Sequence, residues 1–138
     1  MKYLLGFWAP EMNVEIIRIS CLLALLVVEL VDAQSCHTHS NGCSDPFNMA
    51  FKRRFKPACD KHDVCYSCGS GRGVSRARCD QIFYNNMTQY CSGQRRSQRQ
   101  ACYANAHTYY FGVSAFGRRR YLNRPKSWCS QSWVAKCI

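Results

Sequence analysis

The segment FKPACDKHDVCYSCG, residues 55–69, decides how this chain is interpreted, because it places His62 and Asp63 side by side among cysteines. A proline suits the first turn of a helix and a glycine its end, so a helix is predicted from Pro57 until Gly69. Consecutive side chains on a helix point about 100° apart. His62 and Asp63 therefore cannot pair with each other and must face different partners.

These two side chains suit different tasks. An imidazole can act as a general base near neutral pH, provided that a third group orients its ring. A carboxylate suits a hard cation that prefers oxygen ligands. We expect Asp80 to orient His62, because Asp80 lies on the apolar stripe of a second predicted helix, 74–91, where a lone carboxylate is costly to bury unless paired. The loop 69–73 is long enough for the two helices to run antiparallel, which would bring Asp80 opposite His62.

The cysteines around His62 also have spacings typical of a metal site. Within residues 59–68, three cysteines and one histidine are each separated by two residues, and His37 and His39 could join them in binding zinc. Such spacings spread ligands along a helix, however, and an oxidising compartment favours disulfides over free thiolates. The sequence therefore favours disulfides at these positions over zinc.

The N-terminal third of the chain carries a targeting signal. The apolar run 19–31 is too short to span a bilayer, and small residues at the −3 and −1 positions fit cleavage after Ala33. Met12 could be the true start. The alternative is a buried N-terminal helix. We expect residues 1–33 to be a signal peptide and residues 34–138 to be a secreted, extracellular domain.

Removal of residues 1–33 leaves ten of the eleven cysteines, an even number that predicts up to five disulfides in a small secreted domain. The sequence does not give their connectivity. The ten are Cys36, Cys43, Cys59, Cys65, Cys68, Cys79, Cys91, Cys102, Cys129 and Cys137.

The secreted part is strongly basic. Removal of residues 1–33 takes away four acidic but only two basic residues, so the net charge rises from +11 to +13. Because the chain is expected outside the cell, this charge favours an anionic phospholipid membrane or cell surface as partner rather than nucleic acid. The four acids that remain are each informative: Asp45, Asp60, Asp63 and Asp80.

The predicted fold is mainly α, small and rich in disulfides. Two antiparallel helices carry the His/Asp site, and a third helix, 101–116, is apolar nearly all round and is expected to be buried. Residues 34–57 are predicted to be mostly loop, and residues 92–100 a basic irregular link. The tail after Gly117 is predicted to be irregular and pinned by cysteines. No strand signal is strong.

Several segments in order resemble one family. Residues 58–66, ACDKHDVCY, resemble the active-site helix of secreted phospholipases A2. Residues 41–47 resemble the calcium loop of the prokaryotic and fungal branch, and residues 102–117 resemble that branch's last helix. Residues 55–69 are also similar to the conodipine type, which has two chains. The resemblance covers about 41–117, and it implies a phospholipase A2-like fold and hydrolysis of phospholipids.

The resemblance implies roles for three residues on the two helices. His62 would deprotonate a water that attacks the sn-2 ester of a glycerophospholipid. Asp80 would orient His62. Tyr66 could donate its hydroxyl to Asp80 and keep that carboxylate satisfied in an apolar site.

The resemblance also implies one calcium ion as cofactor. Asp63 would ligate it, together with loop carbonyls near Asn41, Gly42 and Cys43, and the Gly42 N–H would join calcium in stabilising the oxyanion. The prokaryotic branch has an aspartate where this chain has Asn41, so calcium should bind more weakly unless Asp45 reaches the ion. Asp45 precedes a proline and could equally be a turn former.

Basic residues indicate processing. Conodipine-type proteins imply excision at Arg95-Arg96 within 92–100, which would leave a two-chain heterodimer joined by disulfides; the alternative is an uncut surface loop. Gly117 is interpreted as a helix C-cap rather than an amidation signal, with the arginines of 118–120 free to bind lipid headgroups. Asn86 begins a glycosylation sequon, but its position inside a helix disfavours occupancy.

The sequence thus favours a calcium-dependent phospholipase A2 and leaves two alternatives. One is a catalytically weak phospholipase-like toxin that acts by binding a membrane receptor or channel, for which Asn41 gives a physical reason. The other is a cationic membrane-active peptide, for which the charge alone suffices.

Overall fold

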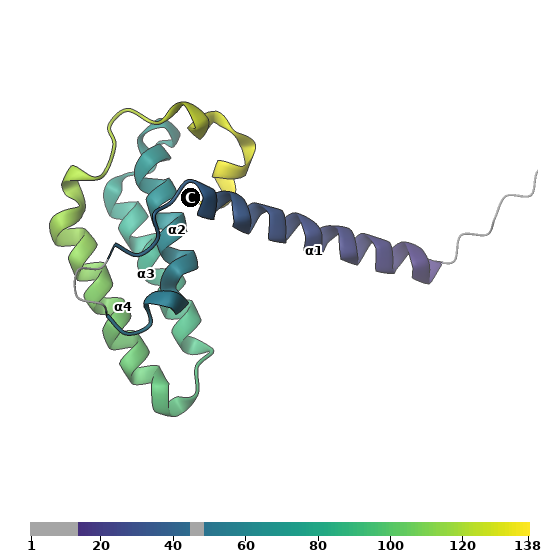
Figure 1. The fold of residues 1–138 in the computed structure, drawn as a ribbon, viewed down its shortest axis with the longest axis horizontal. Helices are drawn as coiled ribbons and strands as arrows, with labels where there is room; N and C mark the ends of the chain where they lie inside the picture. Colours follow the sequence, from purple (N-terminus) through teal and green to yellow (C-terminus); the bar gives the residue numbers. More distant parts are fainter. Residues whose placement is uncertain (1–13, 45–48) are drawn as a thin grey trace, which may run out of the picture. The chain divides into compact units, whose positions relative to one another are not determined.

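A computed structural model describes residues 14–44 and 49–138 of the chain (Figure 1). This part is helical and contains no strand, which confirms the mainly α, disulfide-rich class. Asp45 and Met12 lie outside the described residues. The α-helices are α1 (Val14–Thr38), α2 (Lys52–Cys68), α3 (Arg76–Ser92) and α4 (Arg96–Phe116), and the 3₁₀ helices are η1 (Gly69–Arg72), η2 (Gly117–Arg119), η3 (Ser127–Ser130) and η4 (Ser132–Lys136).

The chain divides into two units, Met1–Val31 and Asp32–Ile138. The described side chains of the first unit, residues 14–27, are all exposed, so they contribute nothing to a core. Within the described residues, no helix is long and apolar enough to cross a membrane. Assignment of residues 1–33 as a signal peptide stays a prediction.

The predicted loop 34–57 is helical at both of its ends. α1 continues to Thr38, because neither glycine nor proline interrupts residues 14–38. α2 begins at Lys52 rather than at Pro57, so the proline lies inside the helix. The early start places Phe55, only 1 % exposed, in the core, and its burial outweighs the hydrogen bond that a proline cannot donate.

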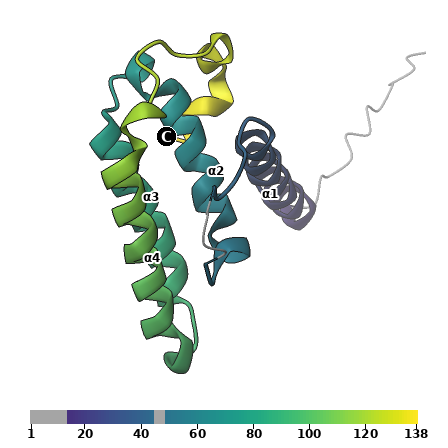
Figure 2. The same cartoon turned by 60° about the vertical axis from the view of Figure 1, so that its left-hand side comes forward.

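The second unit is built on α2, α3 and α4, which lie side by side (Figures 1 and 2). Phe55 at the start of α2 meets Tyr90 at the end of α3, whereas Cys65 bonds Cys79 near the opposite ends. These contacts make the two helices antiparallel, as predicted. The core between the three helices contains Phe55, Phe83, Met87, Ala106 and Tyr109.

α4 differs from the predicted last helix in two ways. It begins at Arg96, so most of the basic link 92–100 is helical, because its arginines and glutamines are good helix formers. Its burial is also confined to one face: Phe111 and Phe116 on the other side are 63 % and 78 % exposed. The apolar residues of α4 therefore fall into two groups. One group packs on α3, and the other lies at the surface.

All ten cysteines of the second unit form disulfides, as the even count predicts, and Cys21 is free. Two of the five bonds, Cys36–Cys137 and Cys68–Cys129, tie segments that are far apart in the sequence, and they help to hold together a unit with a modest core. The pairs are Cys36–Cys137, Cys43–Cys59, Cys65–Cys79, Cys68–Cys129 and Cys91–Cys102.

Candidate functional site

The structure brings His62, Asp80 and Tyr66 together. The Nε2 atom of His62 lies 2.9 Å from Oδ1 of Asp80, and the Tyr66 hydroxyl donates to the same oxygen at 2.6 Å. His62 is 7 % exposed and Asp80 2 %, so little water screens the contact. A carboxylate only accepts hydrogen bonds, so the imidazole proton is on Nε2 and the lone pair on Nδ1. Among the described residues, Nδ1 has no hydrogen-bond partner.

The ring of His62 is held on both sides by aromatic residues. Its centroid lies 4.1 Å from that of Tyr66 and 4.6 Å from that of Phe83. Because Asp80 fixes one ring nitrogen and the two aromatic rings limit rotation, Nδ1 has one direction in which to point. This is the arrangement that a general base requires.

Arg76 is a third partner of Asp80, and the sequence analysis missed it. It donates to Oδ2 of Asp80 at 3.1 Å, and the same nitrogen contacts the carbonyls of Val113 and Ser114 at 3.3 and 3.1 Å. Arg76 thus compensates a buried carboxylate and also binds carbonyls near the end of α4. The spacing of four between Arg76 and Asp80 on one helix was the signal that could have revealed it.

Tyr66 stays protonated because of its surroundings. Burial raises the pKa of Tyr66 well above its usual range, and the hydrogen bond to Asp80 and that residue's charge raise it further. Gly117 is essential to this placement, since a Cβ atom there would occupy the space of the Tyr66 hydroxyl. Gly117 follows α4 as its predicted cap, but its backbone is in the right-handed helical region, which any residue can adopt. The position therefore requires glycine for its lack of a side chain and not for its backbone conformation.

Asp63 faces a different set of groups, as the helix geometry predicts. It lies beside the site loop, defined here as residues 39–44. The Asn41 backbone N–H donates to Oδ2 of Asp63 at 3.0 Å, and the Asn41 side-chain nitrogen lies 2.9 Å from the same oxygen in the amide orientation that satisfies its neighbours. Gly42 has φ of 72°, which glycine adopts without strain. The Cys43–Cys59 disulfide ties the loop to α2.

The residues around Asp63 fit a calcium ion. Burial raises the pKa of Asp63, against the lowering effect of the Asn41 and Gly42 N–H groups and of His62. Its Oδ1 has no hydrogen-bond partner within the described ranges. A partly buried carboxylate that is hydrogen-bonded to the backbone of Asn41, in a loop that also carries the peptide carbonyls of Gly42 and Cys43, offers the oxygen donors that calcium prefers.

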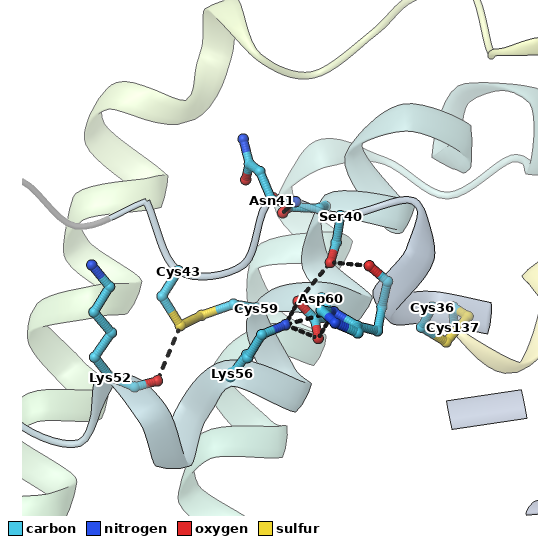
Figure 3. A network of polar contacts seen from close by, with 11 residues as sticks. Cys36, Ser40, Asn41, Cys43, Lys52, Lys56, Cys59, Asp60 and Cys137 are labelled. Carbon is cyan, nitrogen blue, oxygen red and sulfur yellow. Dashed lines mark hydrogen bonds and ion pairs between the residues drawn. A yellow bond between two sulfur atoms is a disulfide. The ribbon is translucent and has the colours of Figure 1, made fainter. Parts of the chain in front are cut away.

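The carboxylate of Asp60, which lies one helical turn before Asp63, is fully engaged by hydrogen bonds and ion pairs within the protein (Figure 3). Lys56 contacts its two oxygens at 2.9 and 2.8 Å, and Ser40 donates to Oδ1 at 2.6 Å. His37 lies 3.3 Å from Oδ2. This network joins α2 to the start of the site loop. It places His37 in an ion-pair cluster, and the disulfides occupy the cysteines, so the predicted preference for disulfides over zinc is confirmed.

A cleft of about 1040 Å³ opens above these groups. The site loop forms one wall, His62 and Asp63 lie in its floor, and the C-terminal half of α4 forms the opposite wall. Phe111 and Phe116, both exposed, line the α4 side. A large cleft with apolar walls and a few polar groups suits a long apolar ligand with one polar reacting centre.

Comparison with known proteins gives the following similarities. Residues 28–117 match a family model described as prokaryotic phospholipase A2. Conodipine-P3 of Conus purpurascens is 45 % identical over 65 residues, 47 % of this chain and 36 % of the relative. The conodipine-M alpha chain of Conus magus is 41 % identical over 61 residues, 44 % of this chain and 79 % of the relative. A secretory phospholipase A2 of Beauveria bassiana is 37 % identical over 82 residues, 56 % of this chain and 42 % of the relative.

The chain therefore spans only about a third of the length of conodipine-P3. No solved structure matches the chain.

Proposed function

The chain belongs to the prokaryotic phospholipase A2 family, and from this premise we propose that it is a secreted, calcium-dependent phospholipase A2 that hydrolyses the sn-2 ester of glycerophospholipids. The observation that carries the proposal is that His62, which is paired with the buried Asp80, lines an apolar cleft together with Asp63. A positioned base and a cation site on one cleft are the two parts that ester hydrolysis by an activated water needs.

The chain's own residues divide the chemistry. Nδ1 of His62 accepts a proton from a water, which attacks the ester carbonyl, and later returns the proton to the leaving alcohol. Asp80 stabilises the imidazolium that forms between these steps, while the hydrogen bonds from Tyr66 and Arg76 hold that carboxylate in place. The rings of Tyr66 and Phe83 prevent the imidazole from turning away.

Asp63 and the carbonyls of Asn41, Gly42 and Cys43 would hold the calcium ion. When bound, calcium supplies a Lewis acid for the ester carbonyl and the negative charge that develops on its oxygen. The N–H of Gly42, a residue that lines the cleft, would donate to the same developing charge.

An anionic phospholipid surface is the proposed site of action. Phe111 and Phe116 expose large apolar rings on the α4 wall of the cleft. The exposed Arg118, Arg119 and Arg120 follow directly after α4. Apolar rings bordered by cations suit the boundary between acyl chains and anionic headgroups.

A two-chain form is also proposed. Arg95, just before α4, and Arg96, its first residue, are both exposed. The name of the conodipine-M alpha chain denotes one chain of that protein. A cut there would separate α2 and α3 from α4 and the tail. Three disulfides would still join the pieces: Cys36–Cys137, Cys68–Cys129 and Cys91–Cys102. Mass spectrometry of the secreted protein before and after reduction would show one mass becoming two, whereas a single unchanged polypeptide would contradict the cut.

Release of fatty acid from phosphatidylglycerol vesicles tests the enzyme proposal. We expect release with calcium and none with EDTA. His62→Gln should abolish release, whereas His107→Gln, a change at the exposed histidine of α4, should leave it unchanged. Circular dichroism should show that both variants are folded.

Two other outcomes would overturn the enzyme proposal. Equal vesicle leakage from wild type and His62→Gln without fatty acid would indicate a cationic membrane-active peptide. If the protein binds tightly to cell membranes and hydrolyses none of their lipid, it would be a toxin that acts on a receptor or channel.

A further inference from the structure

The C-terminal segment, residues 118–138, lies beyond the family match, which ends at residue 117. It folds back onto α2 and the turn that follows (Figure 1, yellow). The Leu122 backbone N–H donates to the Tyr66 carbonyl at 3.0 Å, and the Tyr121 hydroxyl donates to the Val74 carbonyl at 2.6 Å. The segment is thus an ordered addition to the family's helical unit.

Covalent and charged contacts fix the end of this segment. Cys68–Cys129 ties it to the end of α2, and Cys36–Cys137 ties it to the last turns of α1, just before the site loop. The guanidinium of Arg72 donates to the Cys129 carbonyl at 2.7 Å and to the Gln131 carbonyl at 3.0 Å. Of the two tryptophans of the segment, Trp128 directly precedes Cys129 and Trp133 lies between Cys129 and Cys137.

The two tryptophans pack on His39, the first residue of the site loop. The centroid of the His39 ring lies 4.5 Å from that of Trp128 and 4.9 Å from that of Trp133. The indole rings themselves stack at 5.6 Å with 14° between their planes. Aromatic pairs within about 7 Å attract one another beyond the area that they bury. These three rings form what we call the aromatic clamp.

We propose that the aromatic clamp positions the site loop for calcium, which makes the C-terminal segment a positioning element of the metal site. His39 lies on the cleft and only two residues before Asn41. Ser40, between them, is bonded to Asp60. The loop is therefore fixed at its start by the clamp and Ser40 and further on by the Cys43–Cys59 disulfide.

The missing charge at Asn41 explains why such a clamp matters. With fewer charged ligands, calcium affinity depends more on how often the loop already has the binding geometry. The apparent dissociation constant equals the intrinsic one divided by the fraction of competent loop. Loss of one aromatic packing interaction should lower that fraction, and with it the affinity, by roughly three- to tenfold. This inference rests on the proposed calcium site.

Calorimetric titration of the full secreted chain with calcium chloride alone tests the clamp without relying on activity. His39→Ala should raise the calcium dissociation constant by roughly three- to tenfold. His39→Phe keeps an aromatic ring on the tryptophans and should restore binding to within about twofold of wild type. Tyr103→Ala, a change at an exposed aromatic residue of α4, is the matched control and should bind as wild type does.

The outcomes separate the clamp from the proposed function. If wild type and His39→Ala bind calcium with the same dissociation constant, the clamp is overturned and the proposed function stands. Absence of binding by wild type would overturn the calcium-dependent function and the clamp together. If His39→Ala does not fold, Trp133→Leu gives the second comparison: it removes one ring of the clamp, and wild-type affinity in that variant would overturn the inference.

Discussion

Replacement of Arg76 by methionine would measure how much the buried carboxylate of Asp80 depends on a countercharge. Removal of one partner from a fully buried ion pair costs about 3–5 kcal/mol. Arg76 is 30 % exposed, so water screens part of its charge. Asp80 also keeps the hydrogen bonds from His62 and Tyr66. We therefore expect the free energy of unfolding to fall by about 2 kcal/mol.

A double-mutant cycle would show whether the loss arises from the charge pair. Arg76→Met and Asp80→Asn would be made singly and together, and each variant unfolded in guanidinium chloride with its disulfides intact. We expect Arg76→Met to cost little once Asp80 is neutral, which gives a coupling energy of about 1–2 kcal/mol. Arg78→Met, on the exposed side of α3, should change the unfolding free energy by less than about 0.5 kcal/mol.

The same loss in both backgrounds would refute this reasoning. It would mean that Arg76 acts only through the carbonyls of Val113 and Ser114 at the end of α4. The cost would then be that of unsatisfied carbonyls, and Asp80 would be stable with His62 and Tyr66 alone.

Two further predictions concern Tyr66 and its neighbour. Gly117→Ala should lower the unfolding free energy by about 1–3 kcal/mol, because the new methyl group meets the Tyr66 hydroxyl. Gly112→Ala, whose Cβ meets nothing within 4 Å, should instead raise the unfolding free energy by about 0.5–1 kcal/mol. Equal changes in the thermal unfolding of the two variants would contradict this prediction. The raised pKa of Tyr66 means that the folded protein keeps this proton when the unfolded chain has lost it, so stability should fall as pH rises above about 10. Tyr66→Phe should make the unfolding free energy fall less steeply with pH. In the wild type, the ultraviolet absorbance of the Tyr66 phenolate should appear at alkaline pH only when the protein unfolds.

The His62–Asp80 contact could be predicted because it follows from local geometry, whereas the Tyr66 contact was implied only by the family resemblance. Adjacent helical residues diverge, and a carboxylate on an apolar stripe requires a partner. A short loop then leaves an antiparallel pair as the simple arrangement, and the observed contact of 2.9 Å between His62 and Asp80 agrees with it. Each step uses only one helix or two neighbouring helices.

The features that were missed depend on contacts between distant segments. The bonds of Arg76 to Val113 and Ser114 require the position of α4, which no spacing within α3 reveals. The packing of Trp128 and Trp133 on His39 depends on the disulfide connectivity, and ten cysteines allow many pairings. The start of α4 at Arg96 was missed for a different reason. The charged residues of 96–100 suggested an irregular linker, but arginine and glutamine have high helix propensity.

The described carboxylates of the second unit explain why we propose Asp63, and not Asp60, as the ligand of a cation. Asp60 receives Lys56 and Ser40, with His37 nearby, and Asp80 receives His62, Tyr66 and Arg76.

Asp63 accepts hydrogen bonds from the Asn41 backbone and side chain on Oδ2, and burial raises its pKa against the lowering effect of the Asn41 and Gly42 N–H groups. A carboxylate that burial destabilises in its charged form gains most from a cation, because the cation removes the electrostatic cost that the protein leaves uncompensated. The two acids lie three residues apart on one helix, so helix spacing alone does not distinguish them. The difference in the structure arises because Lys56 and the loop residue Ser40 reach Asp60.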